Sequence, residues 1–207
     1  MKIALCLSGI PRFWDRFDIS DYGNVDIYIH SWLDTSSSGC LSGNHPNSLG
    51  LKYKFDFKIL DKFRPKDIKL ERLSDFDFDS LYTKFKNLDG DCRKSVIPMF
   101  YSMSESIKLV KEKYDIIIRS RFDVRLFQPL NLKISDAICI PDQFHYKGVC
   151  DQIAYGNMDN MKIYAGISDY LKTEPKININ PELLLYKWLY INKIKINLTQ
   201  DYFVLLR

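Results

Sequence analysis

The sequence lacks the patterns that mark several common classes of protein. No apolar run approaches the length of a membrane span, and the apolar start, residues 1–7, is too short for the core of a signal peptide. We therefore expect a soluble, cytoplasmic protein with no transmembrane segment. Internal repeats, linkers and low-complexity blocks are also missing, so we expect one domain over residues 1–207.

Cysteine is present without any arrangement that would give it a structural role. There are five cysteines, but no C-x-x-C pair and no cysteine–histidine spacing of a zinc site. The count is odd, and Cys6 and Cys139 lie in apolar runs, where cysteine is usually a small buried hydrophobe. These features favour free thiols in a reducing compartment.

The charged residues show no concentration of one sign. Thirty lysines and arginines stand against 26 acidic residues, giving a net charge of +4, and the cations are interleaved with acids. Proteins that bind nucleic acid usually gather their cations on one face or in one run, so we expect no nucleic-acid partner. A mildly basic chain is better suited to an enzyme with a phosphorylated substrate.

The hydrophobic pattern predicts strands that alternate with helices. Strands are predicted over residues 2–8, 25–29, 53–60, 67–73, 116–118, 137–140 and 152–155, and the tail, 195–206, is strand-like. Helices are predicted over 78–86, 97–113, 160–171 (capped by Asn157 or Asp159) and 181–191. This alternation indicates an α/β, Rossmann-like fold with a mostly parallel central sheet flanked by helices.

The most informative segment is 114–125, YDIIIRSRFDVR. Its three consecutive isoleucines predict a strand buried on both faces, at the middle of a sheet. Four charged residues follow directly: Arg119, Arg121, Asp123 and Arg125. Ligands bind at this end of the strands in α/β sheets, and charges placed there need a partner. The segment therefore predicts either a site for an anion such as a diphosphate, with a metal ion on Asp123, or an internal cluster of arginine–aspartate ion pairs.

Two other predicted strands end in residues that suit the same site. After the first strand come Ser8, Gly9 and Arg12, where a glycine lets the backbone approach a phosphate and an arginine binds it with two donors. No Walker or G-x-G-x-x-G pattern is present, so an ordinary turn is the alternative. His30 ends the second strand and is either a ligand contact at the sheet edge or a hydrogen-bonded core residue.

Acidic residues later in the chain are candidates for a general base. Asp151 directly precedes a predicted strand and either deprotonates an acceptor hydroxyl or caps a turn. Glu182 lies in the first turn of the helix after Pro181, where it complements the helix dipole or acts as a second base. Asp89-Gly90-Asp91 matches the metal-binding pattern Asp-x-Asp, but it follows no core strand and is interpreted as a turn. The polar loop 34–50 is a candidate lid.

Taken in order, these segments resemble a known family. The stretches ALCLSGIPRFW, VDIYIHSW, MFYSMSESIKL, YDIIIRSRFDV, DQIAYGNMDNM and NPELLLYKWL are similar to the small GT-A-type glycosyltransferases of bacterial polysaccharide clusters and large DNA viruses. The resemblance runs from residue 3 to about residue 190. It implies a nucleotide-diphospho-sugar donor at the carboxyl edge of a mostly parallel sheet, and a glycan acceptor.

The resemblance also implies roles for individual residues. Ser8, Gly9 and Arg12 lie near the nucleotide, Arg121 and Asp123 occupy the Asp-x-Asp-like position, and Asp151 lies near the acceptor. His30, Arg119 and Arg125 complete the expected donor-binding set. Mn²⁺ or Mg²⁺ is expected on Asp123, although Arg125 replaces the second acid of the pair.

The expected activity is that of a hexosyl- or deoxyhexosyltransferase. In an inverting reaction Asp151 would deprotonate the acceptor, and in a retaining reaction it would orient it. A non-catalytic nucleotide-sugar- or glycan-binding module is the first alternative. A sugar nucleotidyltransferase is the second, and it would be expected to carry a glycine-rich signature with a nearby lysine, which Gly9-Ile10-Pro11-Arg12 does not provide.

Overall fold

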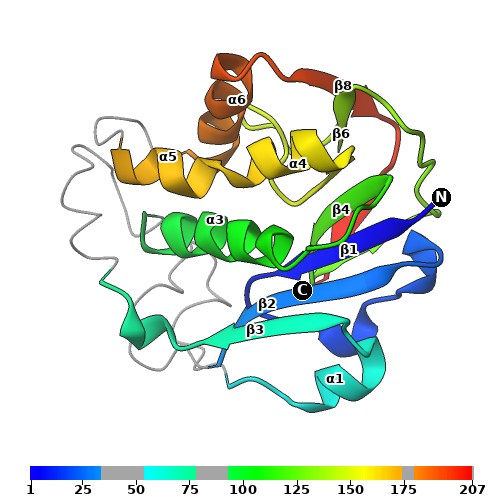
Figure 1. The fold of residues 1–207 in the computed structure, drawn as a ribbon, viewed down its shortest axis with the longest axis vertical. Coiled ribbons are helices and arrows are strands. Elements are labelled where there is room, and N and C mark those ends of the chain that lie inside the picture. Colours follow the sequence, from blue (N-terminus) through cyan, green and yellow to red (C-terminus); the bar gives the residue numbers. More distant parts are fainter. Residues whose placement is uncertain (34–53, 78–92, 174–179, 207) are drawn as a thin grey trace.

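A seven-stranded mixed sheet forms the centre of the protein (Figure 1). The computed structural model describes residues 1–33, 54–77, 93–173 and 180–206. The strand order is β3-β2-β1-β4-β7-β6-β8, and a separate pair of short strands is β5-β9. The strands are β1 (Ile3–Ser8), β2 (Asp26–Trp32), β3 (Asp67–Glu71), β4 (Ile116–Arg121), β5 (Val124–Leu126), β6 (Ala137–Pro141), β7 (Ile153–Gly156), β8 (Lys195–Thr199) and β9 (Phe203–Leu205).

The parallel part of the sheet places several strand ends at one edge. β3, β2, β1 and β4 are parallel neighbours, and Ser8 at the end of β1 is in register with His30 of β2 and Arg121 of β4. β7 is antiparallel to β4, with Ile153 opposite Ser120, so the amino end of β7 lies at the same edge. This confirms the predicted α/β fold with a mostly parallel sheet, and it brings the chain before β7 to the ends of β1 and β4.

Helices cover one face of the sheet. They are α3 (Arg93–Lys108), α4 (Met158–Ala165), α5 (Ile167–Thr173) and α6 (Pro181–Ile191), whereas α1 (Lys58–Phe63) belongs to the other face. Figure 1 shows α3 lying along the sheet with α4, α5 and α6 beside it, while α1 lies apart from this group. No helix in the described ranges is long and apolar enough to cross a membrane.

Neighbouring residues of β4 separate the two faces of the sheet. Arg119 lies near Tyr164 of α4, whereas the Ser120 hydroxyl is 3.0 Å from that of Tyr22, because successive side chains of a strand point to opposite faces. Phe17 stacks on Tyr22 and meets Phe63 of α1 edge-on, so an aromatic layer covers the second face. Both faces of the central strands are therefore buried, as the isoleucine run predicted.

The structure corrects one predicted strand. Residues 53–60 were expected to be extended, but α1 begins at Lys58. Phe55, Ile59 and Phe63 are buried at intervals of four residues while Phe57 is exposed, so a helical turn, and not alternation, decides which side chains enter the core. The predicted helix over 78–86, the loop 34–50 and Asp89-Gly90-Asp91 lie outside the described residues.

The other elements differ from expectation mainly at their ends. α3 begins at Arg93 and ends at Lys108, before the predicted residue 113, and the helix predicted over 160–171 is two helices, α4 and α5. Asn157 is the cap of α4, since its Oδ1 accepts from the backbone N–H of Asn160 at 2.9 Å. Asn180 caps α6 in the same way, and α6 spans the predicted residues 181–191.

Candidate functional site

The turn after β1 forms one wall of the candidate site. Gly9 has φ of +98°, a conformation that favours glycine, and apart from its chain neighbours no atom of the described residues lies within 4 Å of the position a Cβ would take. Its N–H donates to the Ser102 hydroxyl at 2.7 Å, which fixes the turn to α3. The backbone at Gly9 is thus held in place with open space beside it, as a closely approaching ligand would require.

Arg121 and Asp123 form a two-pronged ion pair at the end of β4. Arg121 donates from Nε to Oδ1 at 2.8 Å and from Nη2 to Oδ2 at 2.5 Å. Arg12 lies close to both: burial and the Arg121 charge lower the pKa of its guanidinium, and Asp123 opposes this. The structure therefore brings Arg12, Arg121 and Asp123 together, and it contains the internal ion pair that the sequence left as an alternative.

A metal ion on Asp123 would have to share the carboxylate with Arg121. Both carboxylate oxygens accept from the guanidinium, so an ion would use their remaining lone pairs or displace Arg121. Over the described residues there is no group of three or more histidine, cysteine, aspartate or glutamate side chains that could hold a metal. A single carboxylate with an arginine is a partial fit to a divalent cation, and the metal on Asp123 stays a prediction.

Arg119 is buried behind this pair, at 1% exposure. Its Nε donates to the Ser8 hydroxyl at 3.1 Å and its Nη1 to the Asp151 carbonyl. Both acceptors are neutral oxygens, so neither bond neutralises the guanidinium charge. Arg119 ties the end of β1 to the chain before β7 and adds positive potential beneath the site.

Asp151 and Glu182 are two buried carboxyl groups whose charges interact, and they are called the acidic pair below. The chain around Gly148 packs on the first turn of α6: Val149 N–H donates to the Glu182 carbonyl at 3.1 Å, and a Cβ at Gly148 would overlap the Glu182 backbone. Burial, with the Asp151 charge, raises the pKa of Glu182 to about 7. In the next residue after Asp151, the Oε1 atom of Gln152 is buried and has no hydrogen-bond partner among the described residues. This region therefore holds a group that titrates near neutrality and an unused acceptor.

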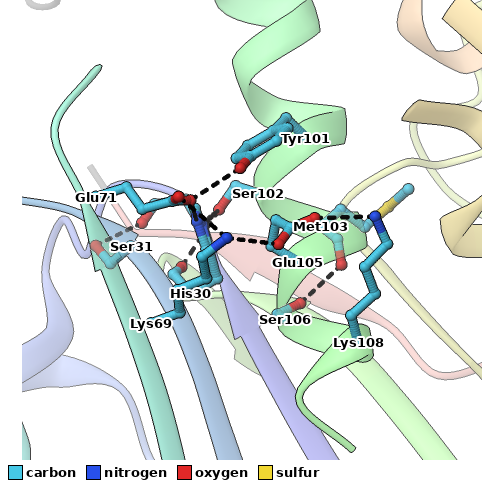
Figure 2. Close-up of polar contacts among 11 residues, drawn as sticks. His30, Ser31, Lys69, Glu71, Tyr101, Ser102, Met103, Glu105, Ser106 and Lys108 are labelled. Carbon is cyan, nitrogen blue, oxygen red and sulfur yellow. Dashed lines mark hydrogen bonds and ion pairs between the residues drawn. The ribbon is translucent and has the colours of Figure 1, made fainter. Parts of the chain in front are cut away.

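His30 belongs to a different, closed arrangement (Figure 2). The ring is fully buried, with Nδ1 2.7 Å from the Ser102 hydroxyl and Nε2 2.8 Å from Glu71 Oε2. Tyr101 donates to Glu71 at 3.0 Å, and Lys69 pairs with Glu71 and Glu105 at 3.0 and 2.7 Å. We call these six residues, His30, Lys69, Glu71, Tyr101, Ser102 and Glu105, the His30 network. Burial lowers the pKa of His30, and the bond to Glu71 opposes this.

The His30 network changes how the predicted role of His30 is understood. Both ring nitrogens are used inside the protein, so a ligand could contact the ring only after one of these bonds breaks. His30 as a donor-binding residue stays a prediction. Its structural link to the site is indirect, through Ser102, whose hydroxyl also accepts from Gly9. Ser102 was not singled out in the sequence, where the only signal is a serine row, 102, 104 and 106, within an amphipathic helix.

Arg125 is not part of the cluster. It lies in β5 with its side chain exposed, between buried Val124 and Leu126, and its charge acts on Asp18 and Asp21. The structure therefore separates the three arginines: Arg119 lies beneath the site, Arg121 lines it with Asp123, and Arg125 lies apart.

A scan against protein-family models and a search of the curated proteins found no match to this chain. The resemblance to glycosyltransferases therefore stays a prediction that depends on residues and geometry.

Proposed function

We propose that the protein is a glycosyltransferase that moves a sugar from a nucleotide-diphospho-sugar donor to a hydroxyl of a glycan acceptor. One observation carries this proposal. At the carboxyl edge of the parallel strands, Arg121 lies with Arg12 and Asp123, and its charge interacts with that of Asp151, which in turn interacts with the second buried carboxyl group, Glu182. Such a transfer needs both parts: cations for a departing diphosphate and a carboxylate for the acceptor proton.

The donor would bind with its diphosphate against Arg12 and Arg121. The open space at Gly9 gives the phosphates room to approach the backbone, and guanidinium groups bind phosphate oxygens with two parallel hydrogen bonds. For Arg121 this means turning from Asp123 towards the donor. Mn²⁺ or Mg²⁺ bound at the freed Asp123 carboxylate would supply further charge neutralisation of the leaving group.

The acceptor would bind beside the carboxyl pair. Asp151 or Glu182 would take the hydroxyl proton as the acceptor oxygen attacks the anomeric carbon of the sugar in an inverting reaction. A base is most effective when its pKa lies near the working pH, which Glu182 satisfies. In a retaining reaction the pair would orient the acceptor instead.

A thermal-shift screen of UDP-, GDP-, CMP- and dTDP-sugars, each with and without Mn²⁺, tests the proposal. A donor at about 100 times its Kd should stabilise the fold by about 2.7 kcal/mol, which is about 5–10 °C for a chain of this size. The shift should disappear in Arg121→Ala and in Asp123→Ala and persist in Arg125→Ala, the matched control from outside the cluster. Absence of any shift, or equal loss in Arg125→Ala, would contradict the proposed donor site.

A non-catalytic nucleotide-sugar-binding module is the second candidate. The observation that favours it is the Arg121–Asp123 pair, which occupies the carboxylate expected to hold a metal. A donor shift without transfer to any glycan acceptor would select this candidate over the enzyme.

A further inference from the structure

Two aromatic side chains are exposed on the loop that leads into the candidate site. Phe144 and Tyr146 are 37% and 61% exposed and belong to the loop over residues 142–148, between β6 and β7. Their rings are stacked, with centroids 6.5 Å apart and an interplanar angle of 21°. Exposed rings that share one orientation offer a flat apolar surface to solvent, which calls for an explanation.

The 142–148 loop is held by polar bonds at both ends. His145 uses both ring nitrogens: Nε2 lies 3.0 Å from Asp142 Oδ1, and Nδ1 accepts from the Cys150 N–H at 3.2 Å. The Gln143 side chain accepts from the Phe203 N–H of β9 at 2.9 Å. The rings therefore stand on a fixed base, and a ligand that stacks on them would not have to order the loop first.

The loop lies between the two halves of the candidate site. On one side the centroid of the Phe144 ring lies 5.5 Å from that of Phe203 in β9. Directly after β9, the Leu206 N–H donates to the Asp123 carbonyl at 2.7 Å. On the other side Gly148 packs on the backbone of Glu182. The chain then continues through Val149 and Cys150 to Asp151, so the loop that carries the exposed rings joins the region where an acceptor hydroxyl would be deprotonated.

The backbone of the loop is strained where it carries the rings. Phe144, Tyr146 and Lys147 have φ of +52°, +39° and +74°, a region that side-chain-bearing residues rarely adopt. Such conformations persist only where the surroundings impose them, and they gather at binding and catalytic sites. Here the strained residues include both exposed rings, so the same backbone that costs stability also presents the stacked surface.

We propose that the Phe144–Tyr146 pair is a stacking platform for a pyranose ring of the glycan acceptor, an inference that rests on the proposed function. The C–H groups on one face of a pyranose carry partial positive charge and are attracted to the negative face of an aromatic ring. The Tyr146 hydroxyl can also bond a sugar hydroxyl. A nucleobase would stack equally well, but the donor phosphates belong at Gly9 and Arg12, whereas the loop that carries the platform packs on the Glu182 backbone at Gly148 and leads to Asp151.

Saturation-transfer NMR with a panel of methyl glycosides tests the platform directly. The panel contains the methyl glycosides of glucose, galactose, mannose, N-acetylglucosamine, fucose and rhamnose, in both anomers. Tyr146→Ala should lower the affinity for the glycoside that binds the wild-type protein by about tenfold. Tyr146→Phe should keep most of the wild-type affinity because the ring is kept. Tyr190→Ala is the matched control: it removes an exposed tyrosine of α6 that lies about 12 Å along the helix from Glu182.

The outcomes separate this inference from the proposed function. Equal affinity in wild type and Tyr146→Ala, or binding of no glycoside, overturns the platform while a donor thermal shift still supports the donor site. Loss of uridine monophosphate binding in Tyr146→Ala, with glycoside binding unchanged, overturns it in favour of a nucleobase contact. Tyr146-dependent glycoside binding without any donor shift supports the platform and removes the donor half of the proposed function.

Discussion

The His30 network and the Asp151–Glu182 region lie at the same edge of the sheet and treat their polar groups in opposite ways. In the His30 network, the hydroxyl of Ser102, both ring nitrogens of His30 and the carboxylate of Glu71 all have partners within 3.0 Å. In the Asp151–Glu182 region, Gln152 has a buried oxygen without a partner, and Glu182 is a carboxyl whose pKa is raised to about 7.

Under the proposed function, this difference separates a region that serves structure from a region where we expect the chemistry. A buried network in which every group is paired holds one arrangement and leaves nothing for a ligand. Unpaired acceptors and shifted pKa values reduce stability, and they gather where a substrate completes the interactions. On this basis His30, the histidine that the sequence offered as a ligand contact, supports the Gly9 turn through Ser102. We expect the reaction at the acidic pair, Asp151 and Glu182.

The largest expected effect separates the two regions by activity. With the donor identified by thermal shift, Asp151→Asn or Glu182→Gln should lower kcat by about 10²–10⁴-fold, the usual contribution of a general base. Sugar transfer to the acceptor is measured by release of the nucleoside diphosphate. Glu112→Gln, which changes an exposed acid paired with Lys2, is the control and should leave kcat unchanged. If both site variants kept full activity, the acidic pair would have no part in the chemistry.

A pair of serines on one helix tests how closed the His30 network is. Ser102→Ala removes the partner of His30 Nδ1 and one of the two acceptors of the Gly9 N–H, which keeps the His30 carbonyl at 3.2 Å, and should cost about 1–3 kcal/mol because the buried ring nitrogen loses its bond. Ser104→Ala removes a buried hydroxyl that has no partner, so its change should lie within about 0.5 kcal/mol of zero or be stabilising. Urea unfolding of both variants gives the difference, and equal losses would contradict it.

The pH dependence of stability should differ between wild type and Glu182→Gln. The pKa of Glu182 is raised from 4.5 to about 7 in the folded state, so the folded protein holds this proton more tightly than the unfolded chain. Relative to Glu182→Gln, the wild type should therefore lose roughly 3 kcal/mol of stability as pH rises from 4 to 8. Parallel curves of unfolding free energy against pH would show that the carboxyl is ionised without penalty.

His30 should give a pH effect of the opposite sign. Its folded pKa is lowered by burial, so the folded protein rejects a proton that the unfolded chain accepts below about pH 6.5. Stability should fall as pH decreases below this value, by at most about 1.4 kcal/mol per pH unit for one proton. Because Glu71 and Glu105 titrate nearby, the test is the difference in slope between wild type and His30→Gln, and an unchanged slope would contradict it.

Much of the fold could be predicted because local patterns and tertiary packing agree. The isoleucines of β4 and the Pro181 start of α6 have one good interpretation each, and the structure contains both elements. Residues 53–60 fit alternation and helical spacing about equally well, and only contacts with distant rings such as Phe17 decide between them. The order in which strands pair is equally hidden, since β1 lies between β2 and β4.

The candidate site could be predicted only in part. The segment with Arg121 and Asp123 is visible because it follows a buried strand directly. Arg119, Arg121 and Arg125 look alike in the sequence, and their separation depends on the turn between β4 and β5. The partners of His30 lie 41 and 72 residues away, at Glu71 and Ser102, so no spacing rule connects them. The stacked, exposed arrangement of Phe144 and Tyr146 could not be predicted either, because it depends on the backbone conformation of the 142–148 loop.

The central position of β1 has a consequence for how the chain folds. β1 pairs with β4 through residues such as Ile3 and Ile116, which are more than a hundred positions apart. Closing so large a loop has an entropic cost before any of its contacts form, so folding should be slow and should have to await the arrival of β4. During synthesis on the ribosome, the apolar first strand would remain half-paired for most of translation, a state in which chaperones commonly bind exposed strand edges.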